Sequence, residues 1–418
     1  MKRKNVLVTG IGQVNYILQL YSQIGPESPN YCFNSLNLRS FGNIHKEKAK
    51  ETFFENFEYE FNFSNFIHII QSLWGVSTDR YFWKHHRIIF SEKGLRFLSR
   101  IIPVFKEHIK AYQLAKFIDE KTATDVIHLH FPKQEYALFI NYLKKEYQII
   151  LTYWGSDIFR INNRMDHEIQ EHIIPLSTFI TVATPEIKFA LITRYGSGFE
   201  DKIKIARFIN DWSFYELADK FMQDSSWESA YLKKNEIPEN KKIILFGHNA
   251  FKENNHLKFL DSLKLIPSEI MEGFHIIFPL TYPADDDYVK NIEHYAKDIP
   301  TTFSCLTEFM DWEDMVKLKL VSNIYIHAPI TDGLSAFLTE FFYTNNLAIV
   351  GSWLPYKTFL KYNIKYLEFD NFDELIAILQ NLSNYSVNTS LNKDIVEENF
   401  KSSIIAKEWL KVFNELPK

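Results

Sequence analysis

The stretch that most constrains the fold of this chain spans residues 331–352, TDGLSAFLTEFFYTNNLAIVGS. An acid, Asp332, precedes a helical pattern over 334–343, and two asparagines then interrupt the helix. Residues 347–350 follow as a short apolar run of the length of a buried strand. Because residues 323–327 also have strand character, the order strand, loop, helix, strand predicts a βαβ unit in a parallel sheet.

The loop of this unit is a candidate ligand site, because open α/β sheets bind ligands at the carboxyl ends of their strands. The helix that begins after Gly333, near Leu334 and Ser335, offers free backbone N–H groups to an anion. Asp332 and Glu340 are eight residues apart, a little over two helical turns, so both can face one ligand. Spacing alone equally allows Asp332 to be a helix cap and Glu340 a solvated helix residue.

Length and composition point to two soluble domains. The chain has 418 residues, 46% of them hydrophobic, which is enough for two cores of ordinary size. A formal net charge of −5 argues against a general nucleic-acid binder, and two distant cysteines, Cys32 and Cys305, suggest a reducing compartment. No signal peptide and no apolar run of about 20 residues is found, so we expect a cytoplasmic protein.

The order of predicted elements divides the chain. Strands alternate with helices up to residue 212, which predicts a first Rossmann-like domain over 1–212 with strands at 6–9, 125–130, 148–152, 179–183 and 202–208. A mostly helical segment, 213–240, leads to a second α/β domain over 241–393. A long amphipathic helix, 394–418, closes the chain and is expected to cross back to the first domain.

In the first domain, polar residues follow three predicted strands. Gly10, Gly12 and Gln13 form a turn that lets a ligand approach the backbone, or simply a tight βα turn. Asn15 stands where a dinucleotide fingerprint needs its third glycine, so that motif fails.

Two more strand ends supply candidate catalytic groups. Asp157 lies just after Gly155, where its carboxylate could take a proton from an attacking hydroxyl or could cap the next helix. His130 is a candidate acid or base, or a structural residue, with Lys133 shortly after it and Trp154 beside Gly155.

In the second domain, Gly247, His248 and Asn249 follow the strand at 242–246, and Lys252 comes close behind. A lysine beside a strand-end glycine can bind a diphosphate, although loop lysines are commonly only solvated. No zinc-ligand spacing, Walker motif or nucleophile elbow is found, so no metal or cofactor is predicted.

Residues 81–116 combine helical apolar spacing with an excess of basic residues. Such helices bind membrane surfaces, or pack as ordinary surface helices on a sheet.

The stretch around Asp332 and Glu340 resembles the acid-x7-Glu motif of retaining GT-B glycosyltransferases, here with Asp in place of the usual first Glu. The resemblance implies that Asp332 faces the donor sugar and that Glu340 binds the nucleotide ribose. The segments WGSDIF, FGHNAFKENNH and FPLTYPADDDYV resemble those of the TDP-N-acetylfucosamine:lipid II N-acetylfucosaminyltransferase group. That likeness implies a bacterial surface-polysaccharide transferase with a lipid-diphosphate-linked acceptor, working at the inner face of the cytoplasmic membrane.

The fold expected from this resemblance is α/β of the GT-B type, with two Rossmann-like domains facing across a cleft. The C-terminal domain would bind the nucleotide sugar, with Tyr282 among its contacts, and the N-terminal domain would bind the acceptor. No metal would be required, because lysine and helix dipoles can neutralise a leaving diphosphate. A nucleotide-sugar epimerase or hydrolase and a non-catalytic sugar-nucleotide-binding subunit are the alternatives.

Overall fold

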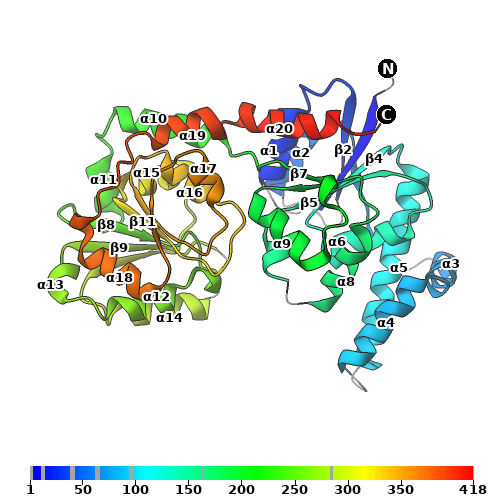
Figure 1. The fold of residues 1–418 in the computed structure, drawn as a ribbon, viewed down its shortest axis with the longest axis horizontal. Helices are drawn as coiled ribbons and strands as arrows, with labels where there is room; N and C mark the ends of the chain where they lie inside the picture. Colours follow the sequence, from blue (N-terminus) through cyan, green and yellow to red (C-terminus); the bar gives the residue numbers. More distant parts are fainter. Residues whose placement is uncertain are drawn as a thin grey trace. The chain divides into compact units, whose positions relative to one another are not determined.

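The structure is a computed structural model that describes residues 3–10, 15–37, 43–61, 66–93, 98–161, 163–282 and 286–417. The chain forms two compact units (Figure 1), Met1–Ile209 with Ile405–Lys418, and Asn210–Ile404. Gly12 and Gln13 lie outside the described residues, so their predicted role is not addressed by the structure.

Unit 1 is built on a seven-stranded sheet in the order β3-β2-β1-β4-β5-β6-β7, and every pairing is parallel. A parallel sheet covered on both faces needs continuous apolar strands, and β4 is buried along its whole length. The strands are β1 (Lys4–Thr9), β2 (Tyr31–Asn37), β3 (Asn56–Glu58), β4 (Val126–His130), β5 (Gln148–Tyr153), β6 (Phe179–Val182) and β7 (Ile203–Ile205).

Helices connect these strands, and three of them, α3, α4 and α5, extend away from the sheet (Figure 1). Ile88 and Ile89 of α4, Val104 of α5 and Met165 of α8 form a small buried cluster. The helices of this part are α1 (Asn15–Ile24), α2 (Asn43–Thr52), α3 (Phe66–Ser77), α4 (Arg80–Lys93), α5 (Leu98–Lys121), α6 (Gln134–Ala137), α7 (Ser156–Phe159), α8 (Arg164–Ile173) and α9 (Pro185–Tyr195).

Unit 2 contains a six-stranded parallel sheet in the order β10-β9-β8-β11-β12-β13. Its strands are β8 (Lys242–Phe246), β9 (Phe274–Pro279), β10 (Thr302–Leu306), β11 (Ile324–His327), β12 (Leu347–Gly351) and β13 (Leu367–Phe369). Its helices are α10 (Trp212–Gln223), α11 (Glu228–Lys234), α12 (His256–Leu263), α13 (Ser268–Met271), α14 (Asp286–Ala296), α15 (Trp312–Val321), α16 (Ala336–Phe342), α17 (Lys357–Lys361), α18 (Phe372–Gln380) and α19 (Asn392–Phe400).

The helical segment between the two sheets and the C-terminal helix differ in their boundaries from what the sequence predicts. The helical segment 213–240 belongs to unit 2. The predicted helix over 394–415 is two helices, α19 and α20 (Ser402–Asn414), because Lys401 has an extended backbone. From Ile405 onward the chain packs in unit 1, where the buried Trp409 donates its indole N–H to the Arg207 carbonyl at 2.6 Å.

Each sheet has one topological switch point. In unit 1 the connections run in opposite directions on either side of β1, which pairs with β2 and β4. In unit 2 the same holds for β8, which pairs with β9 and β11. The crevice outside the carboxyl ends of such strands is where doubly wound sheets bind ligands. We call the carboxyl ends of β1 and β4 the first switch point and those of β8 and β11 the second.

Candidate functional site

The second switch point begins with a glycine that the geometry requires. Gly247 follows β8 with φ +70°, and a Cβ there would lie 2.9 Å from Nε2 of His256. Glycine tolerates both the left-handed backbone and the close approach of the ring. The neighbouring strand, β11, ends at His327.

Hydrogen bonds join the loops after β8 and β11 into one surface. Asn255 donates its side-chain amide to the Ala328 carbonyl at 2.7 Å, and the Ile330 N–H donates to the Glu253 carbonyl at 2.7 Å. Asn249 is buried, and its side-chain oxygen accepts from the Phe251 N–H at 3.0 Å, so it shapes the first loop. The predicted residues of these two loops are therefore brought together.

Asp332 is held as an oriented anion. Its Oδ2 accepts from the Tyr356 hydroxyl at 2.5 Å and lies 3.3 Å from Nε2 of His327, while its Oδ1 accepts from the Gly333 N–H at 2.7 Å. Burial alone would raise the pKa of this carboxyl, but the hydrogen bonds from His327 and Tyr356 and the charge of His327 outweigh burial and hold the pKa well below its usual range. The side chain remains 24% exposed, so a ligand can reach it.

Helix α16 is capped by Ser335 and not by Asp332. The Ser335 hydroxyl accepts from the Leu338 N–H at 3.1 Å, as an N-cap side chain does. Asp332 is therefore available for another role, and Leu334, one of the predicted donor contacts, is buried next to the cap.

Glu340 is buried and paired, in contrast to the alternative of a solvated helix residue. Its Oε2 accepts a hydrogen bond from Lys319, a fully buried lysine on α15 whose ammonium also lies 3.8 Å from the Phe337 ring centroid. Burial lowers the pKa of Lys319, and the charge of Glu340 opposes that shift. Among the described residues, Oε1 of Glu340 accepts no hydrogen bond. Lys319 was not predicted from the sequence, because it lies on a different helix and joins the site by packing.

Lys252 and Tyr282 lie at the exposed edge of the same loops. The Lys252 ammonium lies 5.5 Å from the Tyr288 ring centroid. Tyr282 is 57% exposed, and its carbonyl accepts from the Ala250 N–H at 2.8 Å. Residues 283–285 of the predicted polar loop lie outside the described residues.

His248 lies between the rings of His327 and Phe337, with centroids 5.7 and 5.9 Å away. Its Nδ1 is buried and has no hydrogen-bond partner among the described residues. Burial, helped by the charge of His327, lowers the pKa of His248 to about 3, so the free protein holds this ring neutral.

At the first switch point, Gly10 is again required, because φ is +77° and a Cβ would lie 2.0 Å from the His130 carbonyl oxygen. Here the strand-end histidine is fully buried, and both of its ring nitrogens are engaged. Burial, and then the charge of His128, holds the pKa of His130 well below its usual range.

The hydrogen bonds around His130 form a chain with one possible direction. The indole N–H of Trp154 can only donate, so Nδ1 of His130 accepts at 3.2 Å and Nε2–H donates to Tyr21 at 2.9 Å. The Tyr21 hydroxyl then donates to Nδ1 of His128 at 2.6 Å, and Nε2–H of His128 donates to Thr152 at 2.6 Å. The chain fixes Trp154, whose ring stacks on His130 at an interplanar angle of 10°.

Asp157 is fully buried in the turn that follows β5. Its Oδ1 accepts from the N–H groups of Trp154 and Gly155, both at 2.9 Å, and Gly155 is the residue before α7. Burial raises the pKa of Asp157 to about 6, and the backbone hydrogen bonds limit the rise. The Trp154–Gly155 turn must open before a substrate can reach this carboxylate, and its role as a base remains a prediction.

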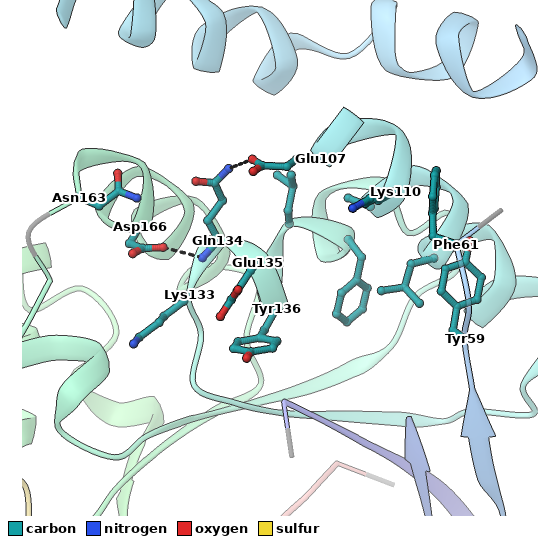
Figure 2. Close-up of a pocket in the computed structure, with 14 residues that line it drawn as sticks. Tyr59, Phe61, Glu107, Lys110, Lys133, Gln134, Glu135, Tyr136, Asn163 and Asp166 are labelled. Carbon is teal, nitrogen blue, oxygen red and sulfur yellow. Dashed lines mark hydrogen bonds between the residues drawn. The ribbon is translucent and has the colours of Figure 1, made fainter. Parts of the chain in front are cut away.

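Lys133 lies on the wall of a separate pocket of about 510 Å³ in unit 1 (Figure 2). Gln134 connects two walls of this pocket, since its side chain donates to Glu107 and its backbone N–H donates to Asp166, both at 2.7 Å. Aromatic, amide and carboxylate side chains complete the lining, among them Tyr59, Phe61, Tyr136, Asn163 and Glu135. The pocket was not predicted, because its residues come from four separate elements.

No metal site is found in the described part of the chain, where no group of three or more His, Cys, Asp or Glu side chains could hold an ion. None of the helices in the described residues is long and apolar enough to cross a membrane.

Comparisons with known proteins give structural neighbours alone. No family model matches the sequence, and no curated protein matches it. A glycosyltransferase from Rickettsia africae superposes with a TM-score of 0.66 at 15% identity, covering 99% of this chain and 98% of that one. Sucrose-phosphate synthase from Thermosynechococcus elongatus gives 0.66 at 11% identity over 99% of both chains.

A third neighbour is HepE from Anabaena in complex with UDP, with a TM-score of 0.63 at 10% identity over 99% of this chain and 100% of that one. These neighbours are glycosyltransferases with two Rossmann-like domains, as is seen here in the seven-stranded and six-stranded parallel sheets. The chain therefore has the GT-B fold.

Proposed function

We propose that this chain is a glycosyltransferase that moves a sugar from a nucleotide-diphosphate sugar to a saccharide acceptor. The observation that carries the proposal is the pair of carboxylates at the second switch point. Asp332 is oriented by three hydrogen bonds, and Glu340, on the helix α16 that follows, is fixed by Lys319 of α15. Structures of the neighbour HepE with UDP and with UDP-glucose support this class of donor.

The donor roles follow from the hydrogen-bonding capacity and the exposure of each group. Oε1 of Glu340 accepts no hydrogen bond from the described residues and can accept from the hydroxyls of a ribose, and the partly exposed Asp332 is assigned to the sugar. Gly247 lets a diphosphate approach the backbone, with Lys252 nearby. No metal is assigned a role, because backbone N–H groups and cations can stabilise a leaving diphosphate.

We assign the acceptor to unit 1. The pocket of Figure 2 combines aromatic rings with amides and carboxylates, which suits the apolar faces and the hydroxyl groups of a sugar. Asp157 is proposed as the proton acceptor, since a carboxyl with a pKa of about 6 can exchange a proton near neutral pH.

A lipid-linked acceptor in bacterial surface-polysaccharide synthesis is the proposed substrate, and α3–α5 are the proposed membrane contact. Residues 81–116 contain eight Lys and Arg against two Asp and Glu. Large apolar side chains are exposed on the same three helices, with Trp74 at 74%, and also Ile70, Trp83, Phe90 and Ile102. Basic residues with exposed aromatic rings are the composition of a helix that lies in a membrane interface.

The donor assignment is tested with Glu340→Gln. The loss of a charge-assisted hydrogen bond to the ribose should weaken nucleotide binding by about 1.5–3 kcal/mol. Calorimetry with UDP- and TDP-linked sugars measures the change, and denaturation of the variant shows whether it is folded. Unchanged affinity in a folded variant would remove Glu340 from the site.

The membrane contact is tested by sedimentation with anionic vesicles of phosphatidylglycerol and phosphatidylcholine. We expect the protein to pellet with them and to be released by salt, and Trp74→Ala to weaken binding. Phe309→Ala, which removes an aromatic ring that is 89% exposed in unit 2, is the matched control. No pelleting at low salt would leave α3–α5 as ordinary surface helices.

A further inference from the structure

Two unpartnered imidazole nitrogens flank the backbone of Gly247. Nδ1 of His248 and Nε2 of His256 are both buried, and neither has a hydrogen-bond partner among the described residues. The ring of His256 approaches so closely that a Cβ on Gly247 would lie 2.9 Å from Nε2. Buried polar atoms are nearly always paired, so two unpaired nitrogens at one strand end indicate a ligand that is still to be bound.

The charges around His248 come from every element that packs near it. Asp332, in the loop after β11, raises the pKa of His248, while His327 of β11, His256 of α12 and Lys319 of α15 lower it. Lys319 already neutralises Glu340 in a buried ion pair, so Asp332 leaves this group with one net negative charge when the histidines are neutral. A diphosphate bound here would add two more negative charges, and a further cation would stabilise it.

Resting on the proposed function, we propose that binding of the nucleotide-sugar diphosphate at the second switch point takes up one proton from solvent, and that His248 receives it. The protonated imidazole then faces the phosphates as a cation. Only a proton is transferred: a buffer acid or hydronium ion gives it up, and an N–H bond forms on the ring.

Of the three histidines at this switch point, His248 is the one that can take up a proton when the donor binds. His256 is fully buried, and both nitrogens of His327 are engaged by Tyr325, Tyr356 and Asp332. His248 is half-buried, so an anion can approach its exposed edge. Burial keeps the pKa of the free ring at about 3, and a bound anion raises it, so donor affinity falls as pH rises from the pKa of the free ring to the pKa of the complex and is constant above it.

The test is titration calorimetry with UDP-glucose and TDP-glucose near pH 7 in PIPES and in Tris, two buffers of different ionisation enthalpy. The esterified diphosphate of these sugars has no proton to exchange near neutral pH, so the buffer dependence of the heat reports protonation of the protein. We expect an uptake of about half to one proton near pH 7, and an affinity that falls by up to about tenfold per pH unit as the pH rises from about 5 to 7. Uridine, which has no phosphate, should bind without uptake.

Two variants identify the residue that takes up the proton. His248→Gln should abolish the uptake, and His275→Gln, a control at a buried histidine on β9 of the same unit, should keep it. Donor binding without proton uptake in the parent protein, or uptake that survives in His248→Gln, overturns the inference and leaves the proposed function intact. If neither of these sugars nor any GDP- or ADP-linked sugar binds, the proposed function fails, and the inference fails with it.

Discussion

The two switch points share a backbone plan and differ in their side chains. Each has a glycine with positive φ after the first strand of its sheet, Gly10 or Gly247, and a histidine at the end of the neighbouring strand, His130 or His327. At the first switch point the histidine belongs to a buried chain of neutral groups. At the second it contacts a carboxylate.

This difference shows how one fold can hold two kinds of site. The neutral chain in unit 1 satisfies both of the ring nitrogens of His130 and fixes a tryptophan, so it positions groups without charge. The second switch point keeps Asp332 exposed, and among the described residues Oε1 of Glu340 accepts no hydrogen bond and Nδ1 of His248 has no partner. Unpaired buried polar atoms occur at strand ends of both units, since the Thr9 and Tyr153 hydroxyls also have no partner among the described residues. What distinguishes unit 2 is that its unpaired nitrogen lies near an exposed carboxylate that can face a ligand.

The largest expected effect concerns Asp157, and it tests whether unit 1 supplies a catalytic group or only positions the substrate. If Asp157 is the base, Asp157→Asn should lower turnover by about 10²–10⁴-fold while donor affinity hardly changes. Steady-state kinetics with the true acceptor and calorimetry with the donor make the measurement. Turnover within a few-fold of the parent would leave Asp157 as the group that holds the Trp154–Gly155 turn, and unit 1 would then supply only positioning.

The second prediction concerns the buried charge in unit 2. Lys319→Met should lower the free energy of unfolding by about 3–5 kcal/mol, because it leaves Glu340 buried without its partner. Lys317→Met is the matched control on the same helix, where the pair with the exposed Glu313 is worth about 1 kcal/mol or less. Denaturant unfolding compares the two variants. Equal losses of unfolding free energy would show that the buried pair stabilises the fold no more than the exposed pair does.

The smallest effect is the acid sensitivity of the neutral chain in unit 1. Burial lowers the pKa of His128 to about 3, below the value of about 6.5 in an unfolded chain. Its contribution to stability is therefore complete above about pH 6.5 and is lost as the pH falls from there toward 3, by about 1.4 kcal/mol per pH unit.

Unfolding measured between pH 7 and 4 should show a shallower dependence in His128→Gln than in the parent protein. The exposed His294→Gln serves as the control and should leave the slope unchanged. An identical slope in the parent and in His128→Gln would mean that the ring is already protonated in the folded chain.

The sequence allowed the fold to be predicted where strands are buried on both faces. The runs that became β8 and β9 are apolar apart from Lys242 and His275, and the chain order alone implied parallel sheets. Strands β2 and β10 escaped prediction because β2 contains three polar residues, Asn34, Ser35 and Asn37, and β10 is only half-buried at a sheet edge. Both lack the continuous apolar run that makes a strand recognisable in a sequence.

The candidate site could be predicted only for the residues that lie on its loops. Gly247 and Asp332 follow strands, and the carboxyl ends of parallel strands meet at one edge of a sheet. Lys319 and Tyr356 come from other elements and join the site by packing, which no local pattern reveals. The same holds for Tyr21, more than one hundred residues from the histidines that it connects.

The central claim is that the nucleotide sugar binds at the second switch point and not at the first. Amide hydrogen exchange, measured with and without UDP-glucose or TDP-glucose, tests it on the intact chain. The account predicts slowed exchange in peptides that contain residues 247–256 and 332–340, with peptides around Gly10 and His130 unchanged. Protection confined to Gly10, His130 and Trp154, with none in unit 2, would contradict it.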